Sequence, residues 1–315
     1  MAEPRHRLLV VATIPADLRA AFDRAYDLVD HASLSAPSGP FATTAGFDVA
    51  VTTGMRGFDE AMMAAVPDLG LIVSQGVGLE RIDLAAARRR GIAVCHTPDE
   101  LTEDVAEAAI ALTFAIMRRV VEADHFVRAG RWLKERMAPS TRVAGKTMGI
   151  VGLGKIGRSI AARATALGMT VAYHGRRQQA DAPYTYVGDP RELAATADVL
   201  VLSCVGDAGT RHLIGAAALE ALGPAGYLVN VARGSVVDEA ALLDALEQGR
   251  IAGAALDVFA DEPRIDPRFL ALGNVVLQPH SASITHETRA AIIDRMLRDT
   301  AAYLAKQPFH DATRG

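Results

Sequence analysis

The second half of the chain holds one glycine-rich motif and three polar side chains that could do chemistry. The glycine-rich motif runs Gly152-Leu153-Gly154-Lys155-Ile156-Gly157, and Arg233, Glu262 and His280 each follow a short apolar run. A guanidinium can bind a carboxylate, and an imidazole oriented by a carboxylate can give a proton to an oxygen that develops negative charge. These residue types together suit addition of a hydride to a carbonyl group.

The glycine motif stands where a strand gives way to a helix. Met148–Val151 is predicted to be a strand, and the helix expected over Ile156–Leu167 begins inside the motif. Gly152 permits a tight turn, Gly154 lets the backbone approach a pyrophosphate, and Gly157 lets helix and strand pack closely. The pattern predicts a dinucleotide site at the helix N-terminus, and the alternative is a glycine-rich turn without a ligand.

The next predicted strand ends in His174-Gly175-Arg176-Arg177. A site tuned for NAD usually has an acidic residue here, which accepts hydrogen bonds from the ribose 2′-hydroxyl. His174, Arg176 and Arg177 would instead attract a 2′-phosphate. We therefore expect NADP as the preferred cofactor with NAD possible, and the alternative is a solvated basic turn.

Strand-like and helix-like segments alternate along the chain, which indicates mainly parallel sheets. The carboxyl ends of parallel strands meet at one edge of a sheet, so Arg233, Glu262 and His280 are expected to line one crevice. The strands are predicted at 7–12, 48–53, 69–74, 92–95, 147–151, 170–174, 198–203, 227–231, 251–258 and 274–277, and the main helices at 83–90, 102–129, 156–167, 190–195, 216–222, 238–248 and 287–306.

A long helix is predicted over 102–129, with Thr102 as its N-cap and acidic residues in its first turn. Its interior, 105–117, is apolar on nearly every face except at Glu107. Such a helix must be covered on most sides, either by the same chain or by a second copy. Residues 34–46 are rich in Ser, Pro, Gly and Thr and are predicted to form a loop.

Composition narrows the class of protein. The 315 residues favour two domains, and the formal net charge of −4 with mixed charges argues against nucleic-acid or membrane partners. Cys95 and Cys204 are the only cysteines, which fits a reducing compartment. No signal-peptide core or membrane-spanning stretch is found, so a cytoplasmic location is expected. No His or Cys pair has the spacing of metal ligands, and no metal site is expected.

In their order along the chain, these motifs resemble those of the D-isomer-specific 2-hydroxyacid dehydrogenases. The resemblance covers nearly the whole chain and includes Val77–Asp83, Thr97-Pro98 and Arg128–Trp132. The stretch His174–Arg177 and the Val77-Gly78-Leu79 loop are similar to the NADPH-preferring glyoxylate/hydroxypyruvate reductase group. The resemblance implies reduction of a small 2-keto acid to the D-2-hydroxy acid.

The resemblance also implies roles for individual residues. Arg233 would hold the substrate carboxylate and polarise the keto oxygen, His280 would protonate that oxygen, and Glu262 would orient His280. The backbone amides of Val77 and Gly78 would bind the substrate carboxylate, and Leu79 would complete the substrate site together with Arg233 and His280. The implied cofactor contacts are Gly152, Gly154, Lys155, Ile156, Gly157, His174, Arg176, Arg177, Cys204, Val205, Thr210, Val231, Asp257 and Ser283.

The implied fold is α/β, with two doubly wound Rossmann-like domains and the cofactor domain inserted into a smaller substrate domain. Residues 1–98 and 286–315 would form the substrate domain, and 99–285 the dinucleotide-binding domain. A homodimer through 102–132 is expected, with Trp132 either packing in the interface or reaching the partner's substrate pocket. One departure is the loop 205–210, where relatives often carry a proline-containing turn.

Three alternatives stay open at this point. The enzyme could act on bulkier 2-keto acids of the hydroxyphenylpyruvate kind, since Leu79 could line a larger pocket, or it could be similar to phosphoglycerate dehydrogenase. A third alternative, from another class, is a dinucleotide-sensing corepressor without enzymatic activity.

Overall fold

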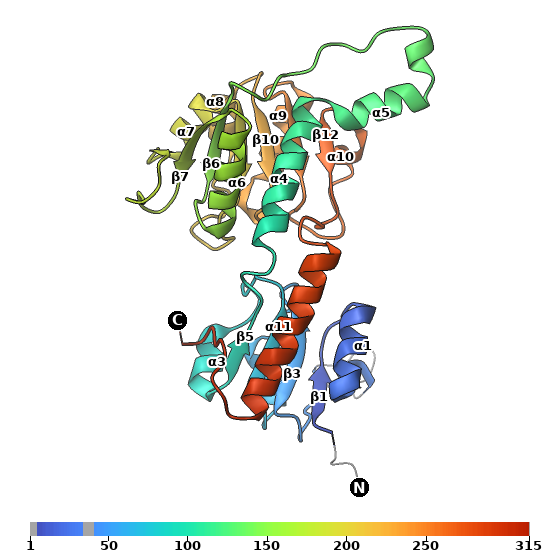
Figure 1. Cartoon of the computed structure of the whole chain (residues 1–315), viewed down its shortest axis with the longest axis vertical. Coiled ribbons are helices and arrows are strands. Elements are labelled where there is room, and N and C mark those ends of the chain that lie inside the picture. The colour runs from blue at the N-terminus through green and yellow to red at the C-terminus, as the bar shows by residue number, and fades with distance from the viewer. Residues whose placement is uncertain (1–4, 34–40, 315) are drawn as a thin grey trace. The chain divides into compact units, whose positions relative to one another are not determined.

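The computed structural model describes residues 5–33 and 41–314, which form two compact units. Unit 1 contains residues up to Leu101 together with Thr285 onward, and unit 2 is the continuous segment Thr102–Ile284 (Figure 1). Of the loop predicted at 34–46, residues 34–40 lie outside the described residues. No helix in the described ranges combines the length and the apolar character needed to cross a bilayer.

Unit 1 is built on a five-stranded parallel sheet of order β2-β1-β3-β4-β5. This is one of the common doubly wound orders. Its strands are β1 (Arg7–Val10), β2 (Asp27–Asp30), β3 (Val49–Thr53), β4 (Leu71–Gln75) and β5 (Ala93–Cys95).

Apolar side chains project from both faces of this sheet, and a separate cluster of buried apolar residues covers each face. One face packs on α1 (Ala16–Ala25) and α11 (His286–Leu304), and the other packs on α2 (Glu60–Ala65) and α3 (Leu84–Arg90). The helix predicted over 83–90 is α3, which begins one residue later because Asp83 is its N-cap and accepts from the Ala86 N–H at 2.8 Å, and Gly91 ends the helix at a φ of 70°. A short 3₁₀ turn spans His31–Ser33.

Unit 2 is built on a seven-stranded parallel sheet of order β12-β11-β10-β9-β6-β7-β8. The chain order reverses between β6 and β9, which is the switch point where this fold binds ligands. The strands are β6 (Thr147–Val151), β7 (Thr170–His174), β8 (Thr185–Tyr186), β9 (Val199–Leu202), β10 (Tyr227–Asn230), β11 (Gly253–Leu256) and β12 (Val275–Leu277).

Helices cover both faces of the second sheet (Figure 1). On one face, α4 (Thr102–Met117) packs against β10, β11 and β12, and α6 (Lys155–Ala166) lies beside it on β6 and β7. On the other face, α7 (Pro190–Thr196), α8 (Ala216–Leu222) and α9 (Glu239–Glu247) enclose a large apolar cluster. The predicted fold class, with two doubly wound parallel sheets, is confirmed.

The single helix predicted over 102–129 is wrong. The structure has two helices, α4 and α5 (Val120–Arg128), because Arg119 adopts a left-handed φ of 54° and ends the first helix. The predicted N-cap is also wrong, since Thr102 is the first residue of α4 and its buried hydroxyl has no hydrogen-bond partner among the described residues. The sequence pattern did not predict β2, β8, α2 or α10 (Arg268–Ala271), all of which are six residues or shorter.

Candidate functional site

The side chains of His280 and Glu262 meet beyond the carboxyl ends of β12 and β11. Nδ1 of His280 lies 2.7 Å from Oε2 of Glu262, and Oε1 of Glu262 accepts from the Phe259 backbone N–H at 2.8 Å. Burial alone would raise the pKa of Glu262, but the bonds from His280 and Phe259 and the charges of His280 and Arg233 outweigh it and lower that pKa. An ionised carboxylate only accepts, so Nδ1 carries the shared proton and Nε2 is the ring nitrogen that Glu262 leaves available.

The backbone of His280 is held in an unusual conformation. Its φ is 52°, in the left-handed region that few residues other than glycine adopt, and its N–H donates to the Asp257 carbonyl oxygen at 2.8 Å. Oδ1 of the buried Asp257 accepts from the N–H groups of Ser281 and Ala282 at 2.7 and 3.1 Å. Burial raises the pKa of Asp257 despite these two bonds. Asp257 thus fixes the turn that aims the imidazole.

Arg233 follows β10, the strand beside β11. The buried side chain of Asn230 shapes this turn, because its Nδ2 donates to the Arg233 carbonyl oxygen at 3.0 Å and its Oδ1 accepts from the Ala232 N–H at 3.0 Å. The guanidinium Nη1 donates to the Ala232 carbonyl oxygen at 2.8 Å. Arg233 is close enough to Glu262 for its charge to lower the carboxyl pKa. The structure therefore brings Arg233, Glu262 and His280 together at one sheet edge.

The glycine-rich turn connects β6 to α6. Its three glycines differ in whether the backbone conformation or the packing requires a glycine at that position. Gly152 has a φ of 97° and a Cβ there would stand 2.6 Å from the Cys204 backbone, while a Cβ at Gly157 would overlap the Gly152 carbonyl oxygen. Gly154 has neither a positive φ nor any heavy atom within 4 Å of its ideal Cβ position. Since packing does not require Gly154, the open space beside it fits a ligand that approaches the backbone, as a dinucleotide pyrophosphate does.

The remaining predicted cofactor residues lie at the ends of strands and helices of unit 2. Lys155 and Ile156 open α6, and Arg176 and Arg177 follow β7. His174 ends β7, but its Nδ1 lies 3.0 Å from the Val187 carbonyl oxygen and already has a structural contact. Cys204 and Val205 follow β9, Val231 follows β10, and Ser283 lies beyond β12. The Thr210 hydroxyl donates to the Val205 carbonyl oxygen at 2.7 Å, so it stabilises its own loop.

The loop of Val77, Gly78 and Leu79 follows β4 in unit 1. The backbone of Gly76 exchanges bonds with Thr97, and the Val77 carbonyl oxygen lies 3.1 Å from Nδ1 of His96. Gly54 crowds the loop, since a Cβ there would stand 2.8 Å from the Gly78 carbonyl oxygen. Leu79 packs against the apolar cluster on the α2–α3 face of the sheet. Within unit 1, this loop is therefore a constrained stretch of backbone.

The sequence did not predict several residues that hold the site in place. Asn230 and His96 act through bonds to backbone of the motifs, and Gly206 leaves space for Arg233. Gln179 joins the two cofactor loops, because its Nε2 donates to the Leu153 carbonyl oxygen at 2.9 Å. Only Asn230 had a sequence signal, its place in the Asn-Val-Ala-Arg run. Within residues 5–33 and 41–314, no three His, Cys, Asp or Glu residues are grouped so that they could hold a metal ion.

Comparison with known proteins gives a consistent result. Residues 110–282 match the family described as D-isomer specific 2-hydroxyacid dehydrogenase, NAD binding domain. The chain is 46% identical over 252 residues to a 2-ketogluconate reductase of Gluconobacter oxydans, covering 80% of this chain and 81% of that protein. It is 42% identical over 255 residues to a glyoxylate/hydroxypyruvate reductase A of Arabidopsis thaliana, covering 81% of this chain and 82% of that protein.

A solved structure agrees with the sequence relatives. An NADPH-dependent glyoxylate/hydroxypyruvate reductase of Sinorhizobium meliloti, in complex with NADP and malonate, superposes with a TM-score of 0.86 and 36% identity, covering 96% of this chain and 94% of that one.

Proposed function

This chain belongs to the D-isomer-specific 2-hydroxyacid dehydrogenase family, and on that premise we propose that it reduces a small 2-keto acid, of the glyoxylate or hydroxypyruvate kind, to the D-2-hydroxy acid with NADPH. The observation that carries the proposal is the 2.7 Å pair of His280 and Glu262 beside Arg233, at the sheet edge that also bears the open glycine turn. The 2-keto acid relatives and the NADPH-dependent structural relative support the same reading.

His280 is the proposed proton donor. Glu262 accepts a hydrogen bond from Nδ1–H of His280 and so orients the ring, and the proton that the keto oxygen needs would come from Nε2. When bound, the nicotinamide supplies the hydride. As negative charge develops on the keto oxygen, Arg233 stabilises that charge and binds the substrate carboxylate. The role of Glu262 is to orient the imidazole ring of His280.

The loop of Val77, Gly78 and Leu79 is the proposed contribution of the smaller domain. Its backbone N–H groups would bind the substrate carboxylate, and the bonds from Thr97 and His96 keep the loop in one conformation. We assign the substrate domain to residues 1–98 and 286–315 and the cofactor domain to 99–285.

The cofactor preference is proposed from charge. Arg176 and Arg177 stand where an NAD site would carry a carboxylate, and guanidinium groups pair with a 2′-phosphate. The pyrophosphate would bind at Gly152, Gly154 and Gly157 with Lys155 and Ile156. The other proposed contacts are His174, Cys204, Val205, Thr210, Val231, Asp257 and Ser283.

A second candidate is reduction of a bulkier 2-keto acid. The relative with 46% identity is a 2-ketogluconate reductase, and a sugar acid is larger than glyoxylate. The reaction and the roles of Arg233, Glu262 and His280 would be the same in both cases, so only the substrate side chain separates the two candidates.

Initial rates with a substrate panel test the proposal. Glyoxylate, hydroxypyruvate, 2-ketogluconate and hydroxyphenylpyruvate should each be offered with NADPH and with NADH. We expect NADPH-linked reduction of at least the small acids, and the kcat/KM ratios rank the two substrate classes. Cofactor binding without turnover of any keto acid would contradict the proposal and favour the dinucleotide-sensing alternative.

Two sets of variants test the proton donor and the cofactor-binding arginines separately. His280→Ala should lose most of kcat while keeping cofactor affinity, and unchanged turnover would remove His280 from the mechanism. Arg176→Ala and Arg177→Ala should weaken NADPH more than NADH, whereas equal losses would favour the solvated basic turn.

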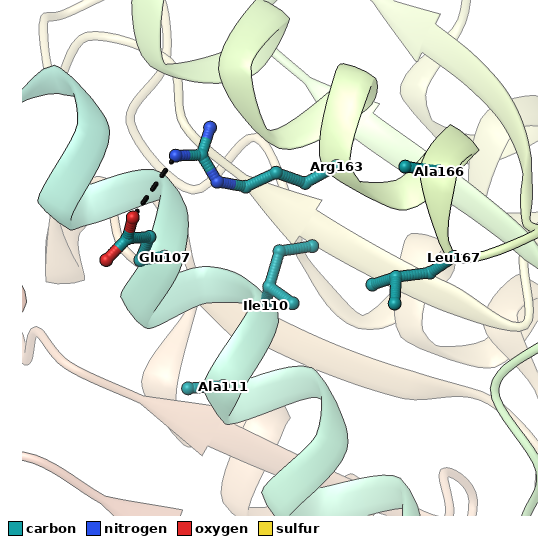
Figure 2. Close-up of a pocket in the computed structure, with 6 residues that line it drawn as sticks. All are labelled: Glu107, Ile110, Ala111, Arg163, Ala166 and Leu167. Carbon is teal, nitrogen blue, oxygen red and sulfur yellow. Dashed lines mark hydrogen bonds and ion pairs between the residues drawn. The ribbon is translucent and has the colours of Figure 1, made fainter.

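A homodimer is proposed from the exposed apolar surface of unit 2. Figure 2 shows a groove between α4 and α6, where Ile110, Ala111 and Leu167 lie beside the Glu107–Arg163 ion pair. Beyond α4, helix α5 and the 3₁₀ turn Arg131–Leu133 project from the unit (Figure 1), and among the described elements α5 packs mainly against α4 and this turn. Trp132 and Leu133 there are 69% and 91% exposed, and such a surface favours coverage by a second copy.

Light scattering after gel filtration tests the assembly. Leu133→Asp should lower the measured mass toward one chain, while the control Leu270→Asp, at a residue 70% exposed on α10, should leave it unchanged. Trp132→Ala distinguishes the two roles of that residue, because only contact with the partner's pocket would change KM while the mass stays that of a dimer. A single-chain mass for the unmodified protein would contradict the homodimer.

A cytoplasmic location is proposed from cysteine chemistry. Cys95 and Cys204 are both free thiols, which fits a reducing compartment. Fractionation of cells that express the tagged chain would test this location, and recovery outside the cytoplasmic fraction would contradict it.

A further inference from the structure

Three side chains beside the glycine-rich turn form a cluster that the proposed chemistry does not use. Arg158, on the first turn of α6, donates from Nη2 to Oδ1 of Asp181 at 2.8 Å and to Oε1 of Gln179. Gln179 donates to the Leu153 carbonyl oxygen at 2.9 Å, and its backbone N–H donates to the Tyr173 hydroxyl at 2.8 Å. The cluster therefore ties α6, the glycine turn and the loop after β7 to one another.

The cluster lines a depression that carries positive charge. Lys155, Arg158 and Arg177 all lie on its wall with Gly154, and among the described residues that line it Asp181 is the sole carboxylate. The hydrogen bond from Arg158 lowers the pKa of Asp181, so this carboxylate is ionised at neutral pH. Its side chain is 75% exposed, and the carboxylate therefore stands at the open side of a basic depression.

Arg158 and Arg177 differ in their partners. No carboxylate among the described residues lies within ion-pair distance of the Arg177 guanidinium, whereas both Nη2 hydrogens of Arg158 are engaged by Asp181 and Gln179. An exposed ion pair of this kind contributes little free energy, so a stronger anion can replace Asp181 on Arg158 at small cost.

We propose that Arg158 is a third cation for the 2′-phosphate of the cofactor and that Asp181 competes with this phosphate for Arg158. Asp181 then lowers the affinity for phosphorylated dinucleotides and sets how strongly NADPH is preferred. Gln179 is a positioning residue, since it holds the Arg158 guanidinium beside the glycine turn. The inference rests on the proposed use of NADPH and adds the residues that set the strength of that preference.

Calorimetric titration of the full-length protein with two cofactor fragments tests the inference without any turnover. Adenosine 2′,5′-bisphosphate carries the 2′-phosphate and adenosine 5′-monophosphate lacks it, so the ratio of their dissociation constants reports the phosphate subsite alone. Asp181→Asn should bind the bisphosphate about threefold more tightly, which is the scale of an exposed ion pair. Arg158→Gln should bind it about tenfold more weakly, the scale of one charge-assisted hydrogen bond. The monophosphate should bind alike in all variants.

Two controls separate competition at Arg158 from a general effect of charge. Asp244→Asn makes the same change in net charge at an exposed carboxylate paired with Arg268 at 3.3 Å, and it should leave both fragments unaffected. In the double variant Arg158→Gln/Asp181→Asn, the gain from Asp181→Asn should disappear, because the competition needs Arg158.

Three outcomes would contradict the roles of Arg158 and Asp181 or the NADPH preference on which they rest. If Arg158→Gln weakens the binding of both fragments equally, Arg158 is a structural residue of the glycine turn. A gain from Asp181→Asn that persists without Arg158, or no gain at all, would remove Asp181 as a competitor. If the unmodified protein binds both fragments equally, the proposed NADPH preference itself fails, and this result is distinct from the failure of Arg158 or Asp181 alone.

Discussion

Arg233 lies directly against Gly206: a Cβ added to Gly206 would stand 2.5 Å from Cγ and 2.8 Å from Cβ of Arg233. Both distances are well inside van der Waals contact. Gly206 belongs to the loop that follows β9. The absence of a side chain at Gly206 therefore leaves the space that the Arg233 side chain occupies.

Gly206→Ala should displace Arg233 and lower kcat/KM for the keto acid. Arg233 is flexible, but its Cβ is fixed to the backbone, so the added methyl group must move the whole side chain. A misplacement of about 1 Å at a substrate-binding group costs roughly 100-fold in rate. Steady-state kinetics with saturating cofactor measures this loss.

The matched control is Gly273→Ala, because an ideal Cβ at Gly273 meets nothing within 4 Å. It should leave kcat/KM unchanged. Wild-type kinetics in Gly206→Ala, with an unaltered thermal midpoint, would show that Arg233 has another route to the substrate.

Glu262→Gln should change how stability depends on pH. The pKa of Glu262 is lowered in the folded protein, so the stability that its ionised form contributes is present above the usual carboxyl pKa of about 4.3. That contribution is lost as the pH falls through the lower, folded pKa. At pH 7 the variant should be less stable by about 1 kcal/mol, the difference between a charged and a neutral hydrogen bond.

Thermal unfolding from pH 7 to pH 3 measures this effect. The difference in midpoint between the unmodified protein and Glu262→Gln should be full at pH 7 and shrink toward the acid end. Asp261→Asn, at an exposed carboxylate one residue earlier in the chain, serves as the control. A difference that stays constant over the whole range would mean that the Glu262 charge does not stabilise the fold.

His96→Phe should raise KM for the keto acid with little change in kcat. Burial lowers the pKa of His96, so the ring is neutral and its Nδ1 donates to the Val77 carbonyl oxygen at 3.1 Å. Loss of this bond frees the loop whose backbone we propose to bind the substrate carboxylate. We expect a KM increase of roughly tenfold, which corresponds to about one hydrogen bond.

His96→Asn provides the rescue, because its side-chain N–H₂ can donate from nearly the position of Nδ1. A KM close to that of the unmodified protein in His96→Asn would assign the effect to this one bond. Equal KM values for His96→Phe and the unmodified protein would show that Thr97 alone holds the loop.

Cys204 should react slowly with alkylating agents even though it borders the glycine turn. Burial raises the pKa of its thiol to about 11, whereas an exposed cysteine has a pKa of about 8.5. The thiolate is the reactive form, so at pH 8 labelling by iodoacetamide should be about two orders of magnitude slower than in the urea-unfolded chain. Peptide mass spectrometry over time measures the rate, and equal rates in both states would contradict a buried, protonated thiol.

The sequence by itself determined the fold class and the order of the chemical groups. Apolar runs of strand length alternate with helical patterns, and this alternation requires parallel sheets whose carboxyl ends face one edge. Arg233, Glu262 and His280 each come directly after such a run. Their convergence follows from this topology, so the sequence could predict it before any contact was known.

Tertiary structure decided what depends on contacts between distant segments. The break at Arg119 is a left-handed residue inside a pattern that reads as one helix, and β2 and β8 are too short to give a periodic signal. The space at Gly206 and the bonds of His96, Gln179 and Asp181 join residues with no sequence signal between them. Periodicity reports which face of an element is buried, whereas these details depend on which atoms fill the space opposite.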